Sequence, residues 1–340
     1  MKPSPFDRPP SAESTGPANH PGDRSRRRLI GSTAITLAAC VGALSRAQVT
    51  APASPAASKA DVVRQLPDAM PAAILSQMIS GRKLVGMPGL TWNRKVLTVA
   101  FDGGSDVLYE LLEQTAQEWT SHGGAMKFSF RVKNGQFRHW SPQDTAPAAA
   151  VRVSFRTDEG HNGYWSAVGR MAENVDANQP TMNLDGFPEK LLRYFNGRNP
   201  TAWRSSYEHS VVLHEFGHAL GLAHEHFHPE CQADLRLAKA MAWLMKSPNN
   251  WTYDVARFNM DAPFYFSVTA DIAKTLNSHP VFSTHIDQGS VMLYSFLDEF
   301  YKSGAKSPCK PAVPLGYATS LSKSDIQFYL DKYTHIQSPF

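Results

Sequence analysis

Five histidines lie close together in the chain, and their side chains are candidate metal ligands. The segment 214–229 reads HEFGHALGLAHEHFHP and holds five of the thirteen histidines of this 340-residue chain. Neutral imidazole is the commonest protein ligand for transition metals such as zinc. The spacing of the five decides which of them can bind one ion; they are His214, His218, His224, His226 and His228.

The first three histidines have the spacing of a zinc site. His214 and His218 are four residues apart, which places both imidazoles on one face of a helix. Gly221 can end that helix in a left-handed conformation, so that the chain turns back and His224 reaches the same ion. Three neutral imidazoles leave the fourth position of tetrahedral zinc open for water, as in catalytic sites. We predict that these three histidines bind Zn²⁺.

Glu215 follows the first predicted ligand and can reach a water at the open position, which makes it the candidate general base. A fourth imidazole would close that position and leave Glu215 without a water to activate. We therefore expect His226 and His228 to be loop residues that shape or pack the rim of the site. Surface histidines on an amphipathic helix are the simpler alternative, which the added glycine and third histidine disfavour.

The segment 214–224 matches the signature HExxHxxGxxH, so the chain resembles the metzincin zinc metallopeptidases, in their bacterial astacin-like or matrixin-like branch. Downstream, the segment 290–294 reads SVMLY and resembles the SxMxY turn of the astacin-like branch. The resemblance implies that Met292 forms an apolar floor under the zinc without binding it. It also implies that Tyr294 lies at the edge of the metal, as a loose extra ligand or as a donor to the oxyanion.

Two positions bear on how far this resemblance extends. Leu293 stands where astacins often have a histidine, between Met292 and Tyr294. Glu225 follows the third histidine, as in astacins, where this acid pairs with the new N-terminus after activation. A solvated acid, or one that orients a ligand, is the alternative for Glu225.

The zinc motif lies on a predicted helix that follows a strand, a helix and further strands in the chain. Alternation of apolar residues predicts the strands, and apolar residues at helical spacing predict the helices. The expected strands are 95–101, 126–132, 150–156, 163–169 and 181–185, and the expected helices are 105–122, 207–222, 233–246, 254–259 and 322–333. This order predicts an α+β fold.

The resemblance covers about residues 90–333 and implies a metzincin-like catalytic domain over 90–336. Its N-terminal subdomain would hold a twisted mixed sheet and two long helices. Its C-terminal subdomain would be mostly irregular with a closing helix. Segment 163–169 would lie on or near the edge strand that pairs with an extended substrate. For Trp165 in that segment, packing in the core is the alternative.

The N-terminal residues predict export. Residues 1–47 contain SRRRLI followed by a short apolar stretch, which resembles a twin-arginine signal and is too short to span a membrane. Two ends compete: cleavage after Ala47, or a lipoprotein box at LAAC in which Cys40 is lipidated. The Ala/Pro/Ser-rich start of segment 48–89 predicts a linker or pro-region. The protein would then be periplasmic, secreted or lipid-anchored at the cell envelope.

Two other cysteines would face an oxidising compartment after export. Cys231 and Cys309 are then the two remaining cysteines, and a disulfide between them is one prediction. Two buried free thiols are the alternative. Nothing in the spacing of the cysteines matches a structural zinc site.

The charge of the chain argues against a nucleic-acid partner. Residues 1–47 hold seven Lys or Arg and three acidic residues, which accounts for the net charge of +4; the rest holds 27 of each sign and is neutral. We expect a protein or peptide substrate, no nucleic acid, membrane contact only through a lipid at Cys40, and a monomer.

Together these features predict an exported zinc-dependent endopeptidase. One alternative is an exported surface binding protein that keeps zinc without turnover. Another is a zinc amidase that acts on cell-wall peptides. Glu215 and Tyr294 favour an enzyme, because a structural zinc site requires neither.

Overall fold

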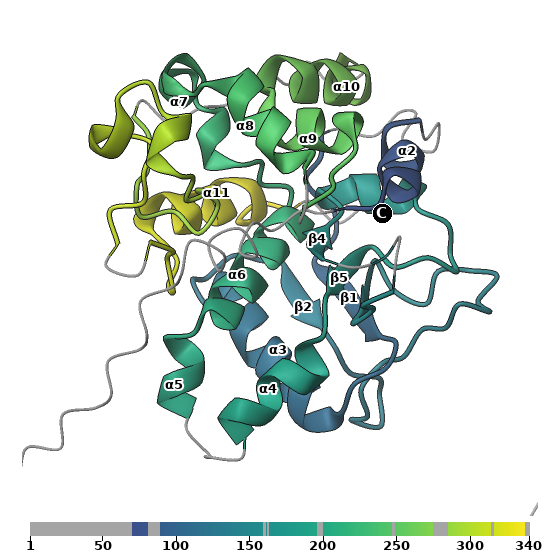
Figure 1. The fold of residues 1–340 in the computed structure, drawn as a ribbon. Coiled ribbons are helices and arrows are strands. Elements are labelled where there is room, and N and C mark those ends of the chain that lie inside the picture. Colours follow the sequence, from purple (N-terminus) through teal and green to yellow (C-terminus); the bar gives the residue numbers. More distant parts are fainter. Residues whose placement is uncertain are drawn as a thin grey trace, which may run out of the picture. The chain divides into compact units, whose positions relative to one another are not determined.

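The computed structural model describes residues 70–80, 89–158, 161, 163–195, 200–246, 249–274, 285–313 and 316–336 (Figure 1). The predicted export signal, Cys40 and most of the predicted linker lie outside the described residues. Among the described residues, no helix is both long and apolar enough to cross a bilayer.

A five-stranded mixed sheet forms the first half of the described chain. Its strands follow the order β2-β1-β3-β5-β4, and β4 pairs antiparallel to β5 while the other neighbours are parallel. Each strand falls within a segment predicted from apolar alternation, although most are shorter than expected. The strands are β1 (Val96–Phe101), β2 (Lys127–Ser129), β3 (Val151–Ser154), β4 (Tyr164–Ser166) and β5 (Met182–Leu184). Strand β4 lies at the edge, as expected for segment 163–169.

Two long helices, each predicted from helical spacing, pack together on this sheet. Helix α3 (Asp106–Thr120) begins at Ser105, whose side chain accepts a hydrogen bond from Leu108 N, and helix α6 (Tyr207–Ala219) begins at Ser206 in the same way. The two helices contact each other, and α6 also contacts β4. Trp119 of α3 donates its indole N–H to Leu213 O in α6 at 2.9 Å, which fixes the register of the pair.

The segment between β4 and α6 contains helices that the apolar pattern did not reveal. They are η2 (Gly169–Asn174), α4 (Phe187–Phe195) and α5 (Pro200–Arg204). Arg152 of β3 supports the chain after η2, because its buried guanidinium donates to the carbonyls of Val175, Asp176 and Gln179. Such a buried cation is tolerated because its donors are paired.

The second half is more helical than the expected mostly irregular subdomain. The predicted helices near 233–246 and 254–259 are present, and so is the predicted closing helix, which the side chain of Ser322 caps. Helix α10 was not predicted. The elements are η3 (Glu225–Phe227), α7 (Pro229–Asp234), α8 (Leu237–Leu244), α9 (Tyr253–Met260), α10 (Ala262–Lys274), η4 (Asp298–Phe300), η5 (Gly304–Lys306) and α11 (Lys323–Tyr333).

A disulfide joins Cys231 of α7 to Cys309, with 5.4 Å between the Cα atoms and 78 residues between the two positions. Both residues are buried, at 0% and 1% exposure. The bridge fastens the loop that follows η5 to the helix that follows the histidine motif.

Helix α2 (Ala72–Ser80) lies within the segment predicted as a linker or pro-region. It packs on η2 and α9, and its apolar side chains join the main core. This part of the predicted linker is therefore a docked helix.

Candidate metal centre

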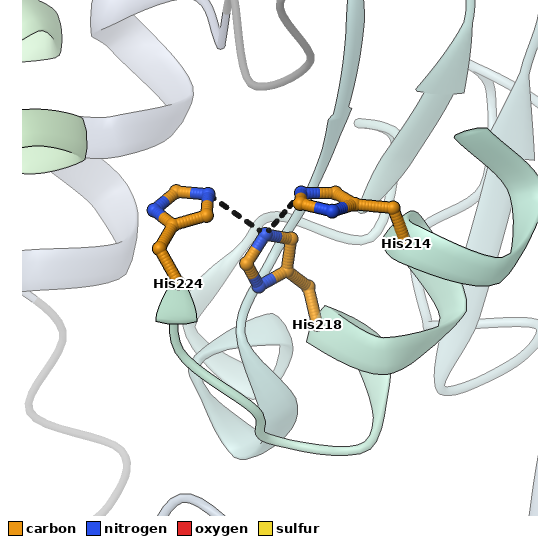
Figure 2. Close-up of side chains that lie close together, drawn as sticks. All are labelled: His214, His218 and His224. Atoms are coloured by element: carbon orange, nitrogen blue, oxygen red, sulfur yellow. Dashed lines mark hydrogen bonds between the residues drawn. The ribbon is translucent and has the colours of Figure 1, made fainter. Parts of the chain in front are cut away.

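Three histidines meet in the interior of the molecule. His214 and His218 project from the last turns of α6, and His224 approaches from the chain that has turned back (Figure 2). Their ligand nitrogens lie within 4.8 Å of one another, and within the described part of the chain no other group of metal-binding side chains does so. All three side chains are buried. This is the set of ligands that the spacing predicted.

The backbone sets which ring nitrogens face one another. Nδ1 of His214 lies 2.7 Å from Val291 O, and Nδ1 of His218 lies 2.8 Å from Leu222 O. A carbonyl oxygen only accepts, so both Nδ1 atoms carry hydrogen, and neutral rings then present Nε2 without hydrogen. Both rings are thereby held in the form that binds a metal ion.

The facing nitrogens fit a zinc ion. Nε2 of His218 lies 3.1 Å from Nε2 of His214 and 3.1 Å from Nε2 of His224, the contacts drawn as dashed lines in Figure 2. The Nε2 atoms of His214 and His218 both lack hydrogen and cannot bond to each other, so a bound cation would stabilise this buried pair. Tetrahedral zinc with Zn–N distances of 2.0–2.1 Å holds its ligand nitrogens about 3.3 Å apart.

Gly221 makes the turn between the second and third histidines. Its φ is +96°, a left-handed conformation that glycine adopts without strain. The helix end is closed by side chains from distant segments: Trp92 donates its indole N–H to Ala219 O at 2.7 Å, and Tyr333 donates its hydroxyl to Leu220 O at 2.6 Å. These bonds satisfy carbonyls that the end of a helix leaves open.

Glu215 and Tyr294 are the residues predicted to act in catalysis, and both are buried. Glu215 is fully buried on α6, directly after the first histidine. The ring of Tyr294 lies 4.5 Å from the ring of His224 and 5.7 Å from that of His214, measured between centroids. Tyrosine 294 is therefore beside the cluster, although 80 residues separate it from His214.

Met292 lies beneath α6 because Gly217 leaves room for it. A Cβ atom added to Gly217 would lie only 2.5 Å from Met292 Sδ and 3.0 Å from the ring of Trp119. Gly217 is a supporting residue that the sequence reasoning did not identify. A glycine inside a strong helix is unfavourable unless packing requires it, and that is the signal that could have revealed it.

Asp325 is a second supporting residue that was not predicted. Its carboxylate, at the start of α11, accepts hydrogen bonds from Ser290 Oγ at 2.7 Å and from Val291 N at 3.1 Å. Because Val291 O in turn receives His214 Nδ1, Asp325 supports a ligand through the backbone of the methionine turn. Burial raises the pKa of Asp325 above its ordinary value, against the hydrogen bonds that lower it.

The last two histidines of the motif lie outside the cluster. His226 is fully buried in η3 rather than in a loop; its Nε2 lies 2.8 Å from Asn259 O, and its ring stacks on that of His224 at 4.8 Å. His228 precedes α7 and accepts a hydrogen bond from Glu230 N on Nδ1. Neither imidazole belongs to the group whose ligand atoms converge.

Glu225, the acid after His224, accepts a hydrogen bond from Asp287 N at 2.8 Å. Burial raises the pKa of its carboxyl to about 7. Its own backbone N–H donates to Met292 O at 2.9 Å, so the residue links the third ligand to the methionine turn.

Comparisons with known proteins give a likeness only at the level of solved structures. No family model matches the chain, and no curated protein does. Two structures of myroilysin are 24% identical, with TM-scores of 0.46 and 0.44; they match 75% and 78% of this chain and 98% and 99% of theirs. High choriolytic enzyme 1, a hatching enzyme zinc-protease from Oryzias latipes (Medaka fish), is 16% identical, with a TM-score of 0.36 over 70% of this chain and 88% of that one. The solved structures similar to this chain thus include a zinc protease.

Proposed function

We propose that the chain is a zinc-dependent endopeptidase of the metzincin type, astacin-like in its methionine turn. The observation that carries the proposal is the buried convergence of three Nε2 atoms within 4.8 Å, on a helix that also bears Glu215. The backbone carbonyls that orient two of the rings support a bound metal rather than an ordinary histidine cluster.

Each residue has a role in the proposed reaction. His214, His218 and His224 would hold Zn²⁺, which when bound supplies Lewis acidity toward a peptide carbonyl and lowers the pKa of water. Glu215 takes a proton from the attacking water and delivers it to the leaving amine. Tyr294 donates its hydroxyl hydrogen to the developing oxyanion, a contribution typically worth a few kcal/mol.

The proposal includes export of the protein. Export is inferred from the twin-arginine-like leader in residues 1–47. The leader would end either by cleavage after Ala47 or at Cys40, which would then be lipidated. The disulfide between Cys231 and Cys309 supports it, because such bonds persist in oxidising compartments. The substrate would be a protein or peptide outside the cytoplasm.

Replacing Glu215 by Gln tests the enzymatic proposal. The variant keeps the size and shape of the side chain and one acceptor oxygen but cannot take a proton. We therefore expect one zinc per chain, an unchanged melting temperature and a loss of at least ~100-fold in the rate of cleavage. The measurements are metal analysis, thermal melting and hydrolysis of a peptide library. A zinc-loaded parent with no chelator-sensitive cleavage would instead indicate a binding protein, and cleavage confined to cell-wall peptides would indicate an amidase.

A further inference from the structure

Three aromatic rings pack against one another beside the histidine cluster. The imidazole of His226 lies 4.7 Å from the phenol ring of Tyr294, measured between centroids, and the ring of Phe296 lies 5.4 Å from the same phenol. His226 and Phe296 also contact each other, at 5.4 Å. The three side chains are buried, with no more than 5% of any of them exposed. The phenol of Tyr294 therefore cannot turn without displacing a close-packed neighbour.

His226 contacts a proposed zinc ligand as well. Its ring stacks on that of His224, with 4.8 Å between the centroids and 16° between the ring planes. His226 itself is not one of the three histidines whose ligand atoms converge. One imidazole outside the ligand set thus touches both the third proposed ligand and Tyr294, the proposed oxyanion donor.

Helix α9 fixes the orientation of the His226 ring. Nε2 of His226 lies 2.8 Å from the carbonyl oxygen of Asn259, in the last turn of that helix, and the contact is buried. A carbonyl oxygen only accepts, so Nε2 donates hydrogen, and the imidazole cannot rotate without breaking this bond. Gln232 of α7 holds the two backbones together, because its side-chain amide donates to His226 O at 3.0 Å and to Met260 O at 3.1 Å. The ring that packs on Tyr294 is therefore itself held in one orientation.

The second neighbour of Tyr294 is fixed from another part of the chain. The backbone N–H of Phe296 donates to the hydroxyl oxygen of Tyr301 at 3.1 Å. That hydroxyl donates to Cys309 O at 3.3 Å, and Cys309 is joined to Cys231 by the disulfide. Phe296 therefore provides a fixed wall on one side of the phenol, and the imidazole packs on both.

We propose that His226 is a positioning residue that holds the phenol of Tyr294 in the orientation needed to stabilise the oxyanion. A donor contributes to such stabilisation only when it lies about 2.7–3.1 Å from the place where the oxyanion forms, so a small turn of the phenol would lose much of the effect. Because that contact is made in the transition state, its loss should lower kcat and leave KM nearly unchanged. The inference rests on the proposed function, because it takes Tyr294 as the oxyanion donor.

A double-mutant cycle tests whether His226 acts through Tyr294. It compares the full-length, zinc-loaded parent with His226→Leu, Tyr294→Phe and the double variant in the cleavage of one peptide. In the parent background, we expect His226→Leu to lower kcat at least ~10-fold and to change KM by less than about two-fold. In the Tyr294→Phe background, which has no hydroxyl to position, the same substitution should change kcat by less than about two-fold.

Binding of a phosphinic peptide gives a second measurement that needs no turnover. Its tetrahedral phosphorus carries a negatively charged oxygen that stands in for the oxyanion, and the compound is not cleaved. We expect His226→Leu to raise the Kd of this compound at least ~5-fold in the parent background and by less than about two-fold in the Tyr294→Phe background. Metal analysis of each chain should still find one zinc.

His228→Leu is the matched control, because it makes the same substitution at another buried histidine of the motif. His228 caps α7, where its Nδ1 accepts a hydrogen bond from Glu230 N. We expect the kcat and the phosphinic-peptide Kd of this variant to match those of the parent. An equal loss of kcat in His228→Leu and His226→Leu would contradict a specific role for His226.

An equal loss of kcat in both backgrounds of the cycle, or no loss in either, would overturn the inference, because a merely structural role of His226 does not depend on the Tyr294 hydroxyl. Loss of zinc from His226→Leu would also overturn it, since the residue would then be a ligand. If His226→Leu does not fold, His226→Phe replaces it, because it keeps a ring but loses the bond to Asn259 O. That variant should lower kcat at least ~3-fold in the parent background alone, and an unchanged kcat would overturn the inference.

Failure of the proposed function would look different. If the zinc-loaded parent cleaved no peptide and bound no phosphinic peptide, the endopeptidase proposal would fail, and the role of His226 with it. If the parent cleaved peptides and the loss from His226→Leu did not depend on Tyr294, only the positioning role would be wrong.

Discussion

At the scale of single residues, hydrogen bonds from ring nitrogens to backbone carbonyls distinguish the proposed zinc ligands from the histidine beside them. His214 and His218 use Nδ1 for Val291 O and Leu222 O, which leaves Nε2 to face the cluster. His226 instead turns its Nε2 to Asn259 O, so that nitrogen donates hydrogen and does not bind the metal. Adjacent positions in one motif thus take different roles.

Metal content should distinguish His224 from His226. His224→Asn removes one of three ligands and should lower zinc affinity by at least ~100-fold, whereas His226→Leu should keep one zinc per chain. Loss of the His226 packing and of its bond to Asn259 should still cost about 1–3 kcal/mol of unfolding free energy. Zinc titration and urea denaturation of both variants measure the two effects. Loss of zinc from His226→Leu would show that the site uses a fourth histidine.

At the scale of elements, α11 supports the site from the far end of the chain. It positions the methionine turn through Asp325 and closes the end of α6 through Tyr333. Tyr329 of the same helix is fully buried and donates its hydroxyl to Met126 O at 2.6 Å. Burial raises the pKa of Tyr329 to about 12 and also raises that of Tyr333.

These buried tyrosines should make the fold sensitive to alkali. Between pH 10 and pH 12, Tyr329 loses its proton in the unfolded chain but keeps it in the folded chain, so the unfolded state binds fewer protons and stability falls as pH rises. Each such tyrosine contributes a slope of about −1.4 kcal/mol per pH unit, and none below pH 9. Urea midpoints from pH 8 to 11.5 measure the slope.

Tyr329→Phe is the matched control for this dependence. The variant removes one titrating hydroxyl. Above pH 10 its unfolding free energy should therefore fall less steeply with pH than that of the parent, by about 1.4 kcal/mol per pH unit. It should also be less stable at pH 8, because Met126 O loses its hydrogen-bond donor. An unchanged alkaline slope would mean that Tyr329 does not titrate with unfolding.

At the scale of the whole molecule, contacts between distant segments hold the second half around the metal centre. The disulfide joins Cys231 to Cys309, and Tyr301, between the joined positions, donates its hydroxyl to Cys309 O at 3.3 Å. Across the site, α2 bridges η2 and α9. The residues around the histidines thus come from segments throughout the described chain.

Removal of the disulfide should lower the stability of the fold without removing the zinc ligands. For a bridge across 78 residues, the restriction of the unfolded chain is worth about 4.5 kcal/mol. We expect Cys231→Ala/Cys309→Ala to lose about that much unfolding free energy and still to bind one zinc per chain. Denaturation of the parent with and without reductant is the control, and an equal midpoint in both would contradict a stabilising bridge.

The sequence by itself determined the features that depend on local spacing. The spacing of four between His214 and His218 and the turn at Gly221 are local properties of one helix and its end, and such patterns are set by helix geometry. The resemblance to metzincins further indicated Met292 and Tyr294. The sequence predicted an α+β fold but not the order of the strands in the sheet.

Only the tertiary structure decided which distant side chains meet at the site. Gly217 matters because Met292 packs against it, and Asp325 matters because its carboxylate reaches Val291 N. The position of α2 beside His218 could not be read from AAILSQMIS, since an apolar helix face shows that it will be buried but not against what. Periodicity fixes which face of an element is apolar, whereas long-range packing chooses its partner.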